Sequence, residues 1–561
     1  MNTLIRLAAA HVTSFYLTTR TSLPVPGLYL TTFLLFLTQF FLTTIYNVVL
    51  YPRYLSPLRH IPQPPGSHWL TGHTRKIMRE PSGFPAREWV KSVESKGGLI
   101  RYSNWGRERV VPCTPAALAE VLVTKNYDFV KPDQLKHGLG RILGRGILLT
   151  EGEEHKFQRK NLSPAFAFRH IKEIYPVFWK KSQELAACLA VASKVEAGDA
   201  PVKDGDAKHE EHEHAPGTIN VGNWSSRATL DIIGLSGMGQ DFNSLADPSN
   251  KLSQTYANVL RLPPGNILTK ILQFAPMFLP HWLLAALPIK RNADLNEATT
   301  VIKQTCRELI ASKRAVLEKS EKSDDTSHRD ILSVALQSNA FDDENLVNQL
   351  MTFLVAGHET TATSMIWAIY ALCKYPDIQT TLREAIRKSI PSLDSDITAQ
   401  DIDDCHYLQA FCQEVLRLWP PVSLTLRIAG RDTVIQDQVL PKGTTVLLVP
   451  VAVNVSEELW GSDAMEFNPS RWLNADGKCN ASGSAKSNYS FLTFLHGPRS
   501  CIGQKFAVAE FACLLAAWIG KFNTTFEEGC PHAEGEVQIK GGITAKPAGG
   551  LWCNVEEVEG W

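Results

Sequence analysis

A ten-residue segment near the C-terminus, residues 494–503, constrains this chain more than any other part of its sequence. It reads Phe-Leu-His-Gly-Pro-Arg-Ser-Cys-Ile-Gly. Gly497 and Gly503 lie on either side of Cys501, and residues without a Cβ permit a sharp turn in which backbone amides approach the cysteine sulfur. An apolar helical pattern follows from Ile502 to Phe522, so the positive end of a helix dipole also points at the sulfur. The segment therefore predicts a loop that holds Cys501 as a thiolate.

The other residues of this loop indicate what the thiolate binds. A free thiol has a pKa of about 8.5, so a cysteine that ligates a metal ion needs hydrogen-bond donors and positive charge nearby. Arg499 carries a charge that suits a propionate of a haem, and Phe494 can shield the ligand from water. We therefore interpret Cys501 as the axial thiolate of a haem iron. The alternative is an ordinary buried thiol at the start of a helix.

Phe494, Gly497, Arg499, Cys501 and Gly503 would occur together by chance in about one chain of this length in ten thousand. With these five residues the segment resembles the haem-binding motif of the cytochrome P-450 family, the haem-thiolate monooxygenases. The resemblance is to microsomal members of fungal type and covers most of the chain. It implies haem b as the cofactor. It also implies a mainly α fold with small β-sheets, a helical triangular prism with the haem between two helices.

A second motif, residues 356–361, reads Ala-Gly-His-Glu-Thr-Thr within an apolar helical pattern that runs from Glu344 to Leu372. It resembles the family's oxygen-activating motif, in which a hydroxyl and a carboxylate relay protons. The resemblance assigns proton delivery to Thr360 and Glu359, with Gly357 leaving room over the porphyrin. The alternative is a buried helix with a local polar kink.

A third pattern concerns structure rather than catalysis. Glu414 and Arg417 are three residues apart on a predicted helix, so they share a face and can form an ion pair, which in most proteins is solvated. Here the pair precedes a Pro-Pro turn, and Arg471 lies downstream in a Pro-Ser-Arg-Trp segment, as in the family's buried Glu-Arg-Arg cluster. We expect Glu414→Ala to prevent haem incorporation, because the change would strand a buried charge.

Three further residues resemble family positions that bind the haem propionates. Arg427 lies in the extended segment after the Pro-Pro turn. Arg159 occupies the arginine position of a Trp-x-x-x-Arg motif in which His155 replaces the tryptophan, and an imidazole can still donate one hydrogen bond. With Arg499, these residues form the expected propionate-binding set. For His155 and Arg159 the alternative is a solvated helix face.

Composition excludes several other functions. The 561 residues include 57 basic and 57 acidic side chains, a balance without the basic excess of nucleic-acid-binding proteins. Eleven cysteines occur without C-x-x-C pairs, so neither a disulfide scaffold nor a zinc site is indicated. We expect a protein that acts on small molecules and has no nucleic-acid partner.

The N-terminal region predicts a membrane anchor. Residues 28–50 contain no charged side chain and are long enough to cross about 30 Å of hydrocarbon as one helix. More basic residues follow this span than precede it, which places residues 1–27 in the lumen and the remainder in the cytosol. Residues 51–66 then form a proline-rich hinge, and residues 67–561 the haem-thiolate catalytic domain. The alternative is a secretory signal peptide, which has a shorter apolar region and a small-residue cleavage site.

Beyond the anchor the sequence predicts helices with a few strands. A hairpin is expected between Leu99 and Pro112, and further strands between Thr433 and Val449. Residues 194–217 are rich in charge, Gly and Pro and predict a disordered loop. Residues 267–287 are strongly apolar. In the family this region lies over the active site and dips into the bilayer, which implies lipophilic substrates, although ordinary core packing is the alternative.

Together these resemblances imply a single-pass protein of the endoplasmic reticulum membrane that hydroxylates or epoxidises a lipophilic small molecule in secondary metabolism. The chain has no nicotinamide or flavin fingerprint, so electrons must come from NADPH-cytochrome P-450 reductase, with cytochrome b5 as a further candidate donor. A haem-thiolate isomerase or dehydratase and a fatty-acid hydroxylase are the alternative enzymes. A non-catalytic haem sensor would leave Glu359 and Thr360 without a role.

Six Asn-x-Ser/Thr sequons also occur, at Asn161, Asn223, Asn454, Asn480, Asn488 and Asn523. On a cytosolic domain we expect all of them to remain without glycans.

Overall fold

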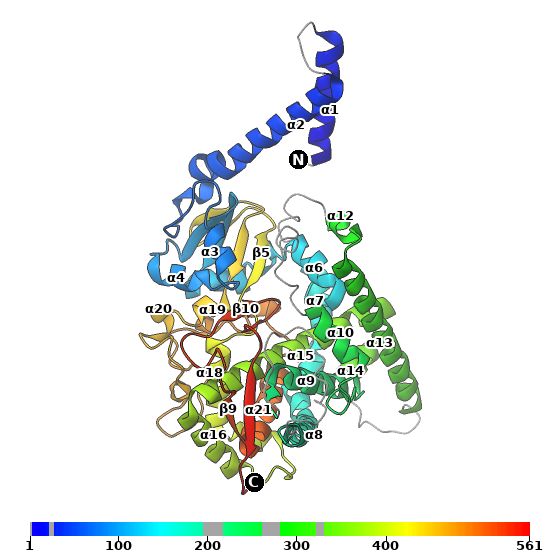
Figure 1. Cartoon of the computed structure of the whole chain (residues 1–561), viewed down its shortest axis with the longest axis vertical. Helices are drawn as coiled ribbons and strands as arrows, with labels where there is room; N and C mark the ends of the chain where they lie inside the picture. The colour runs from blue at the N-terminus through cyan, green and yellow to red at the C-terminus, as the bar shows by residue number, and fades with distance from the viewer. Residues whose placement is uncertain (1–2, 22–26, 195–216, 261–280, 321–329) are drawn as a thin grey trace.

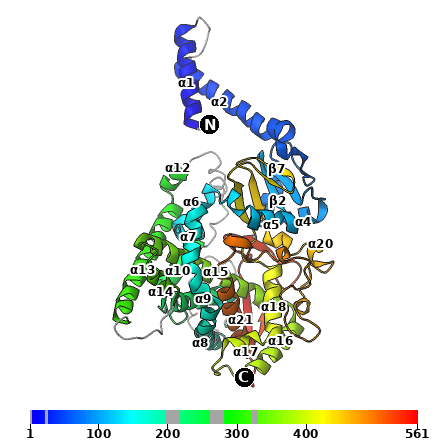
Figure 2. The same cartoon turned by 180° about the vertical axis from the view of Figure 1, so that it is seen from behind.

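The computed structural model describes residues 3–21, 27–194, 217–260, 281–320 and 330–561. Over these residues the fold is mainly helical with small β-sheets, which confirms the predicted fold class (Figure 1). The largest sheet lies at the end of the molecule next to the N-terminal helices, and long helices fill most of the remainder, as the view from behind also shows (Figure 2).

The α-helices are α1 (Thr3–Arg20), α2 (Leu28–Ile45), α3 (Thr74–Arg79), α4 (Pro85–Ser92), α5 (Pro115–Ala119), α6 (Asp133–Leu143), α7 (Gly152–Leu162), α8 (Phe168–Ala192), α9 (Val221–Met238), α10 (Lys251–Leu260), α12 (His281–Ala286), α13 (Lys290–Ser320), α14 (Ile331–Gln337), α15 (Asp343–Lys374), α16 (Pro376–Ser389), α17 (Ala399–Asp403), α18 (His406–Leu418), α19 (Pro450–Val453), α20 (Glu457–Trp460) and α21 (Gln504–Lys521). Short 3-10 or π-helical segments are η1 (Tyr46–Leu55), η2 (Pro57–His60), η3 (Glu120–Thr124), η4 (Asn126–Asp128), η5 (Ser163–Phe166), η7 (Pro469–Trp472), η8 (Asn488–Ser490) and η9 (Gly497–Arg499).

The strands form four small sheets. They are β1 (Leu99–Asn104), β2 (Arg107–Pro112), β3 (Phe129–Val130), β4 (Ile219–Asn220), β5 (Thr425–Ala429), β6 (Thr433–Ile435), β7 (Gln438–Leu440), β8 (Thr445–Leu448), β9 (Phe522–Phe526), β10 (Ile539–Gly541), β11 (Ala545–Pro547) and β12 (Trp552–Glu557). The largest sheet has the order β1-β2-β8-β5-β3, and only its β2–β8 pair is parallel. The others are β4-β12-β9, β10-β11 and β6-β7.

The helix α15 forms the centre of the core. Its side chains are buried almost all the way round, which explains why the sequence there is apolar rather than amphipathic. The helix α9 packs along it, and α6, α13 and α21 contact it elsewhere. This arrangement places the 356–361 motif inside the protein and beside the helix that follows Cys501.

The predicted local structure agrees with the observed elements. The predicted β-hairpin is β1–β2, in which Leu99 pairs with Pro112 and Asn104 with Arg107. Its two turn residues, Trp105 and Gly106, both have positive φ, as a two-residue hairpin turn requires. The strands expected between Thr433 and Val449 are β6, β7 and β8. The apolar helical patterns correspond to α15 and α21.

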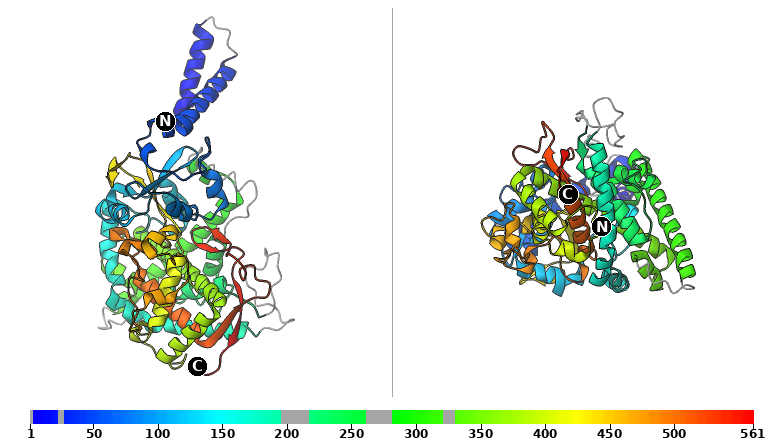
Figure 3. Two further views of the ribbon diagram at one scale, coloured as in Figure 1. Left: turned by 90° about the vertical axis from the view of Figure 1, so that its left-hand side faces the viewer. Right: turned by 90° about the horizontal axis from the view of Figure 1, so that it is seen from below.

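The N-terminal helices project from the rest of the protein (Figure 3). The helix α2 continues as η1, so the apolar helix runs from Leu28 to Leu55 and extends five residues beyond the expected span, into the expected hinge. Residues 3–20, expected only as a lumenal segment, form the helix α1. It packs on α2 through a hydrogen bond from Ser14 Oγ to the Leu28 carbonyl oxygen (2.8 Å).

Two sequence expectations lie largely outside the described residues. One is the disordered loop at 194–217, and the other is the apolar region at 267–287, of which only the part from His281 is described.

Candidate functional site

The loop before α21 has the tight backbone that its glycines predict. Gly497 has a φ of 76°, and a Cβ at this position would lie 2.2 Å from the carbonyl oxygen of Leu122. Only glycine therefore fits between this loop and η3. The backbone N–H of Cys501 donates to the carbonyl oxygen of Phe494 (2.9 Å), which closes the loop. Phe494 itself packs at the edge of the main core.

Cys501 is an exposed residue whose sulfur is nevertheless surrounded by protein atoms that desolvate it. Burial raises the pKa of its thiol, whereas its side chain retains a large accessible surface. The backbone N–H of Gly503 and the positive charge of Arg159 both act against burial and lower this pKa. The sulfur of Cys501 therefore has a backbone amide and a cation beside it. These are the two kinds of partner that the sequence analysis expected near a thiolate.

A cluster of buried cations lies on the same side of the protein. Arg499 forms an ion pair with Glu151 (2.6 Å) and donates to the carbonyl oxygens of Asn126 and Phe129. Lys131 contacts the same Glu151 carboxylate at 3.4 Å. Arg427 is buried, and within the described parts of the chain it donates to Thr425 Oγ1 and the Leu426 carbonyl oxygen, both neutral groups.

The pKa values of this cluster reflect an excess of positive charge. Burial and repulsion by Arg499 lower the pKa of Arg427 to about 10. Burial, with repulsion by Arg427 and Arg499, lowers the pKa of Lys131 to about 8, against the attraction of Glu151. Among the described residues three cations, Arg427, Arg499 and Lys131, thus lie near one carboxylate, Glu151, so the cluster carries two positive charges that are not neutralised. Two propionates carry two negative charges, so this cluster fits a haem.

Lys131 was not predicted from the sequence. It lies directly after the two-residue strand β3, and a single lysine in a loop gives no sign that its side chain is buried. Only the packing of β3 against β5, which carries Arg427, brings these two residues together.

Arg159 and His155 occupy adjacent turns of α7. Arg159 donates to the carbonyl oxygen of Ser500, one residue before the cysteine (2.6 Å). His155 is buried, with Nδ1 3.4 Å from the hydroxyl of Tyr127. Burial and repulsion by nearby cations, Lys131 first among them, lower its pKa to about 4. The imidazole is therefore neutral near pH 7 and can donate one hydrogen bond, and it does not lie on a solvated face.

The proposed proton-delivery pair lies in the middle of α15. The Thr360 hydroxyl donates to the carbonyl oxygen of Ala356 (2.7 Å), so it is turned back into its own helix. The Glu359 carboxylate is almost completely buried. One oxygen, Oε1, accepts a hydrogen bond from Thr544 (2.7 Å) and forms an ion pair with Lys546 (2.8 Å). Neither of these C-terminal partners was predicted from the sequence.

Gly357 lies where α15 contacts α9. A Cβ at this position would lie 2.9 Å from Cγ1 of Ile233, a residue of α9. The missing side chain therefore allows α15 and α9 to approach closely at this point, a contact that the local sequence does not encode. That Gly357 also leaves room over a porphyrin stays a prediction.

Glu414, Arg417 and Arg471 form a fully buried cluster. Glu414 accepts from Nε and a terminal nitrogen of Arg417 (both 2.8 Å) and from Nε of Arg471 (3.0 Å). The indole of Trp472 and the backbone N–H of Asn468 complete the set of five donors. The remaining N–H groups of the two arginines donate largely to backbone carbonyl oxygens. These hydrogen bonds hold α18 against η7.

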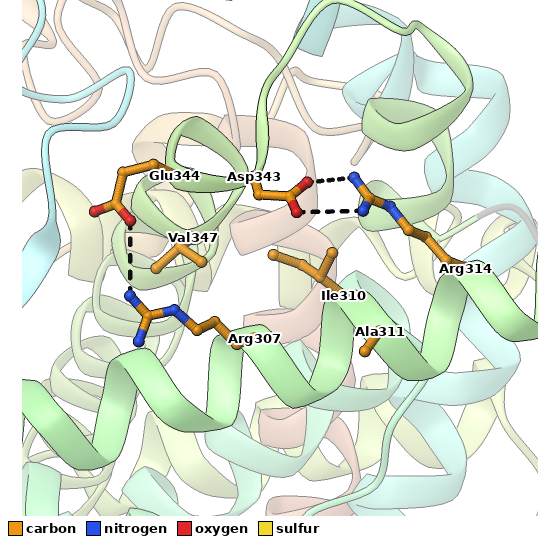
Figure 4. A pocket seen from close by; sticks show the side chains of 7 residues that line it. All are labelled: Arg307, Ile310, Ala311, Arg314, Asp343, Glu344 and Val347. Atoms are coloured by element: carbon orange, nitrogen blue, oxygen red, sulfur yellow. Dashed lines mark hydrogen bonds and ion pairs between the residues drawn. The ribbon is translucent and has the colours of Figure 1, made fainter.

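A separate surface cavity of about 250 Å³ lies between α13 and the first turns of α15 (Figure 4). Arg314 pairs with Asp343 and Arg307 with Glu344 across it, over a floor of apolar side chains. None of the predicted site residues lines this cavity. The paired charges indicate that it is a solvated groove between two helices, and we assign no catalytic role to it.

Comparison with known proteins gives a consistent result. A sequence model of the family described as Cytochrome P450 matches residues 62–553. Cytochrome P450 monooxygenase sphH of Aspergillus fumigatus is 45% identical, over 92% of this chain and 91% of its own length. Cytochrome P450 monooxygenase ALT8 of Alternaria alternata is 41% identical, with 92% of each chain covered. Cytochrome P450 monooxygenase buaD of Petromyces alliaceus is 36% identical, over 95% and 94% of the two chains.

Proposed function

Because this chain belongs to the cytochrome P450 family, we propose that it is anchored in the endoplasmic reticulum membrane and hydroxylates or epoxidises a lipophilic small molecule with electrons from NADPH-cytochrome P-450 reductase. The protein is a cytochrome P450 monooxygenase with haem b as its cofactor. The membrane, the electron donor and the substrate class are our proposal. The fungal relatives favour a substrate of secondary metabolism.

The observation that carries this proposal is the Cys501 loop together with the buried cations beside it. Cys501 would hold haem b, which would supply the binding and activation of dioxygen. Gly503 and Arg159 stabilise the thiolate form of Cys501. We assign Arg427, Arg499, Arg159 and His155 to the propionates, and add Lys131 to them.

The other chemistry required of the protein is proton delivery. We assign it to Glu359 and Thr360, which are consecutive residues of α15, the helix that packs against α21. A buried carboxylate next to a half-buried hydroxyl has no role in a haem-thiolate isomerase or dehydratase. They therefore favour oxygen activation. A fatty-acid hydroxylase would use the same residues and differ only in substrate.

Membrane attachment is supported by the 28-residue apolar helix from Leu28 to Leu55. The exposed side chains along α2, such as Phe33, Leu37 and Phe41, suit contact with lipid rather than water. For the electron donor, two exposed lysines suit an acidic flavoprotein surface. Lys160 follows Arg159, which donates to the Ser500 carbonyl oxygen, and Lys505 lies shortly after Cys501 in the sequence. Cytochrome b5 is a further candidate donor.

The test uses microsomes from cells that express the full chain or its Cys501→Ser variant. We expect a strongly red-shifted ferrous–CO band only in the unchanged protein, and NADPH oxidation that depends on added reductase and on oxygen. Reversing the charges of Lys160 and Lys505 should slow the reduction. NADPH oxidation without any reductase, or an unchanged rate after charge reversal, would contradict the proposed donor.

The same membranes test the topology. We expect the chain to resist alkaline extraction and to show no mobility shift after glycosidase treatment. The absence of a mobility shift is informative because Asn488 is an exposed sequon that a lumenal glycosylation system could modify. A glycan at Asn488 would place the catalytic domain in the lumen and refute the proposed orientation.

A further inference from the structure

The first helix, α1, runs antiparallel to the apolar helix α2 and packs on it. Ser14 Oγ donates to the carbonyl oxygen of Leu28 (2.8 Å), and Nδ1 of His11 lies 3.2 Å from Oγ1 of Thr32. One turn back along α1 thus corresponds to one turn forward along α2. Figure 1 and Figure 2 show the same reversal, with the N-terminal end of α1 directed toward the body of the protein. The two helices therefore form a hairpin.

Small residues form the contact between these helices. On α1, Ala10 and Ser14 are four residues apart and are 5% and 0% exposed. On α2, Thr31 and Thr32 are buried. In lipid no hydrophobic effect drives helices together, so transmembrane helices associate through small residues that permit close approach and through hydrogen bonds between polar side chains. The contact between α1 and α2 has both of these features.

Large apolar side chains are exposed along α1. The following residues have between 45% and 67% of their surface exposed: Ile5, Leu7, Val12, Phe15 and Tyr16. The helix α2 exposes side chains of the same kind, and both helices project from the rest of the protein (Figure 3). A contiguous apolar surface of this kind marks an interaction site. On α1 it continues the surface of α2 that we assign to lipid.

Hydrogen bonds make the polar side chains of α1 compatible with lipid. Among the described residues, composition identifies Leu28–Leu55 as a span but does not identify α1, which is more polar. The hydroxyls of Thr18 and Thr19 donate to carbonyl oxygens four residues earlier in their own helix (2.9 and 2.5 Å). The Thr32 hydroxyl likewise donates within α2 (2.8 Å), so its oxygen accepts from His11. Hydroxyls paired in this way no longer require water.

The length and charge of α1 also suit the membrane. The helix has 18 residues and is about 27 Å long, close to the thickness of the hydrocarbon core. Its two charged residues, Arg6 and Arg20, lie near its ends. Helical side chains point toward the N-terminus, so the guanidinium of Arg6 can extend out of the hydrocarbon at that end. With the N-terminus in the cytosol, Arg6 adds to the basic residues on that side, as the positive-inside bias requires.

We propose that α1 and α2 enter the membrane together as a helical hairpin, so that the N-terminus lies on the same cytosolic side as the catalytic domain. The exposed surface of α1 then contacts the acyl chains of the bilayer. The proposal rests on the proposed membrane attachment through α2. It places two helices in the membrane instead of the single span, and a cytosolic N-terminus instead of the lumenal segment 1–27, that the sequence predicted.

Photocrosslinking in microsomes tests the contact with lipid. In the full chain, p-benzoylphenylalanine replaces Phe15 of α1, Phe41 of α2 or, as the matched control, Phe157 of α7, which are 55%, 61% and 49% exposed. We expect illumination to attach phospholipid at positions 15 and 41 but not at 157. Attachment at 41 without attachment at 15 would overturn the inference. No attachment at 41 would refute the membrane attachment itself, and the hairpin with it.

A second measurement tests the side on which the N-terminus lies. An epitope tag with an Asn-x-Thr acceptor is added through a flexible linker before Met1 or after Trp561 of the full chain. In sealed microsomes we expect added protease to remove both tags, and neither tag to carry a glycan. A glycan on the N-terminal tag alone, with protection from the protease, would refute the hairpin. Glycans on both tags would instead refute the cytosolic orientation of the catalytic domain.

Discussion

At the scale of single residues, two glycines have almost the same backbone conformation but different surroundings. Comparing them separates the cost of a positive φ from the cost of a steric clash. Gly497 and Gly477 have φ values of 76° and 78°. A Cβ on Gly497 would lie 2.2 Å from the carbonyl oxygen of Leu122, whereas a Cβ on Gly477 would meet no atom within 4 Å. The cysteine loop therefore depends on glycine for space as well as for conformation.

We predict that Gly497→Ala destabilises the protein by about 3 kcal/mol or more, because backbone strain and overpacking add. Gly477→Ala carries the strain alone and should lose about 1 kcal/mol. Unfolding monitored by circular dichroism measures both, and the ferrous–CO band should weaken only in Gly497→Ala. Equal losses in the two variants would show that the approach of the loop to Leu122 is unimportant.

At the scale of elements, the approach of α15 to α9 determines the identity of a residue in the 356–361 motif. Gly357 faces Ile233 across this contact, and Cγ1 of that isoleucine would lie 2.9 Å from an added Cβ. Ile233 is buried and Gly357 is half-buried. The glycine is therefore a packing residue within a segment in which two other residues, Glu359 and Thr360, are assigned to chemistry.

Accordingly, Gly357→Ala should destabilise the haem-loaded protein by about 1–3 kcal/mol through overpacking. Ile233→Ala alone should also be destabilising, since it leaves a cavity. Combined, the two changes should cancel in part, because the methyl group of one occupies the space vacated by the other. Thermal unfolding of the four proteins measures this coupling. If Ile233→Ala does not relieve Gly357→Ala, the glycine is required for another reason, such as space near the haem.

At the scale of the whole molecule, stability is expected to fall in mild acid, because several histidines are kept neutral in the interior. Burial lowers the pKa values of His155, His358 and His496, and that of His155 reaches about 4. An unfolded histidine has a pKa of about 6.5. Between these two values the unfolded chain binds more protons than the folded one, so stability rises with pH through this window and is lost as pH falls through it.

We therefore expect the free energy of unfolding to decrease between pH 7 and pH 4, with His155 alone contributing on the order of 3 kcal/mol. In His155→Gln the side chain no longer titrates, so the decrease should be smaller by that amount. Denaturant unfolding of both proteins at several pH values measures the difference. Identical pH dependence in the two proteins would show that His155 does not resist protonation.

The sequence alone was sufficient for features that depend on neighbouring residues. The Cys501 loop, the hairpin at Leu99–Pro112 and the apolar helices could be predicted because turn conformation and burial leave a periodic or local pattern. The same holds for the apolar helix that begins at Leu28. Even there, the pattern placed the end of the span at residue 50, five residues before the helix ends at Leu55, since helix termini are weakly encoded.

Only the tertiary structure decided which side chains meet across the fold. It brought Lys131 into the cationic cluster, placed Ile233 against Gly357, and joined Lys546 to Glu359. These partners lie far apart in the chain and come from different elements, so their contact depends on how helices and strands pack against one another. The sequence shows which chemical groups each residue carries. Which buried charges lie close enough to attract or repel one another is decided by the packing of the whole chain.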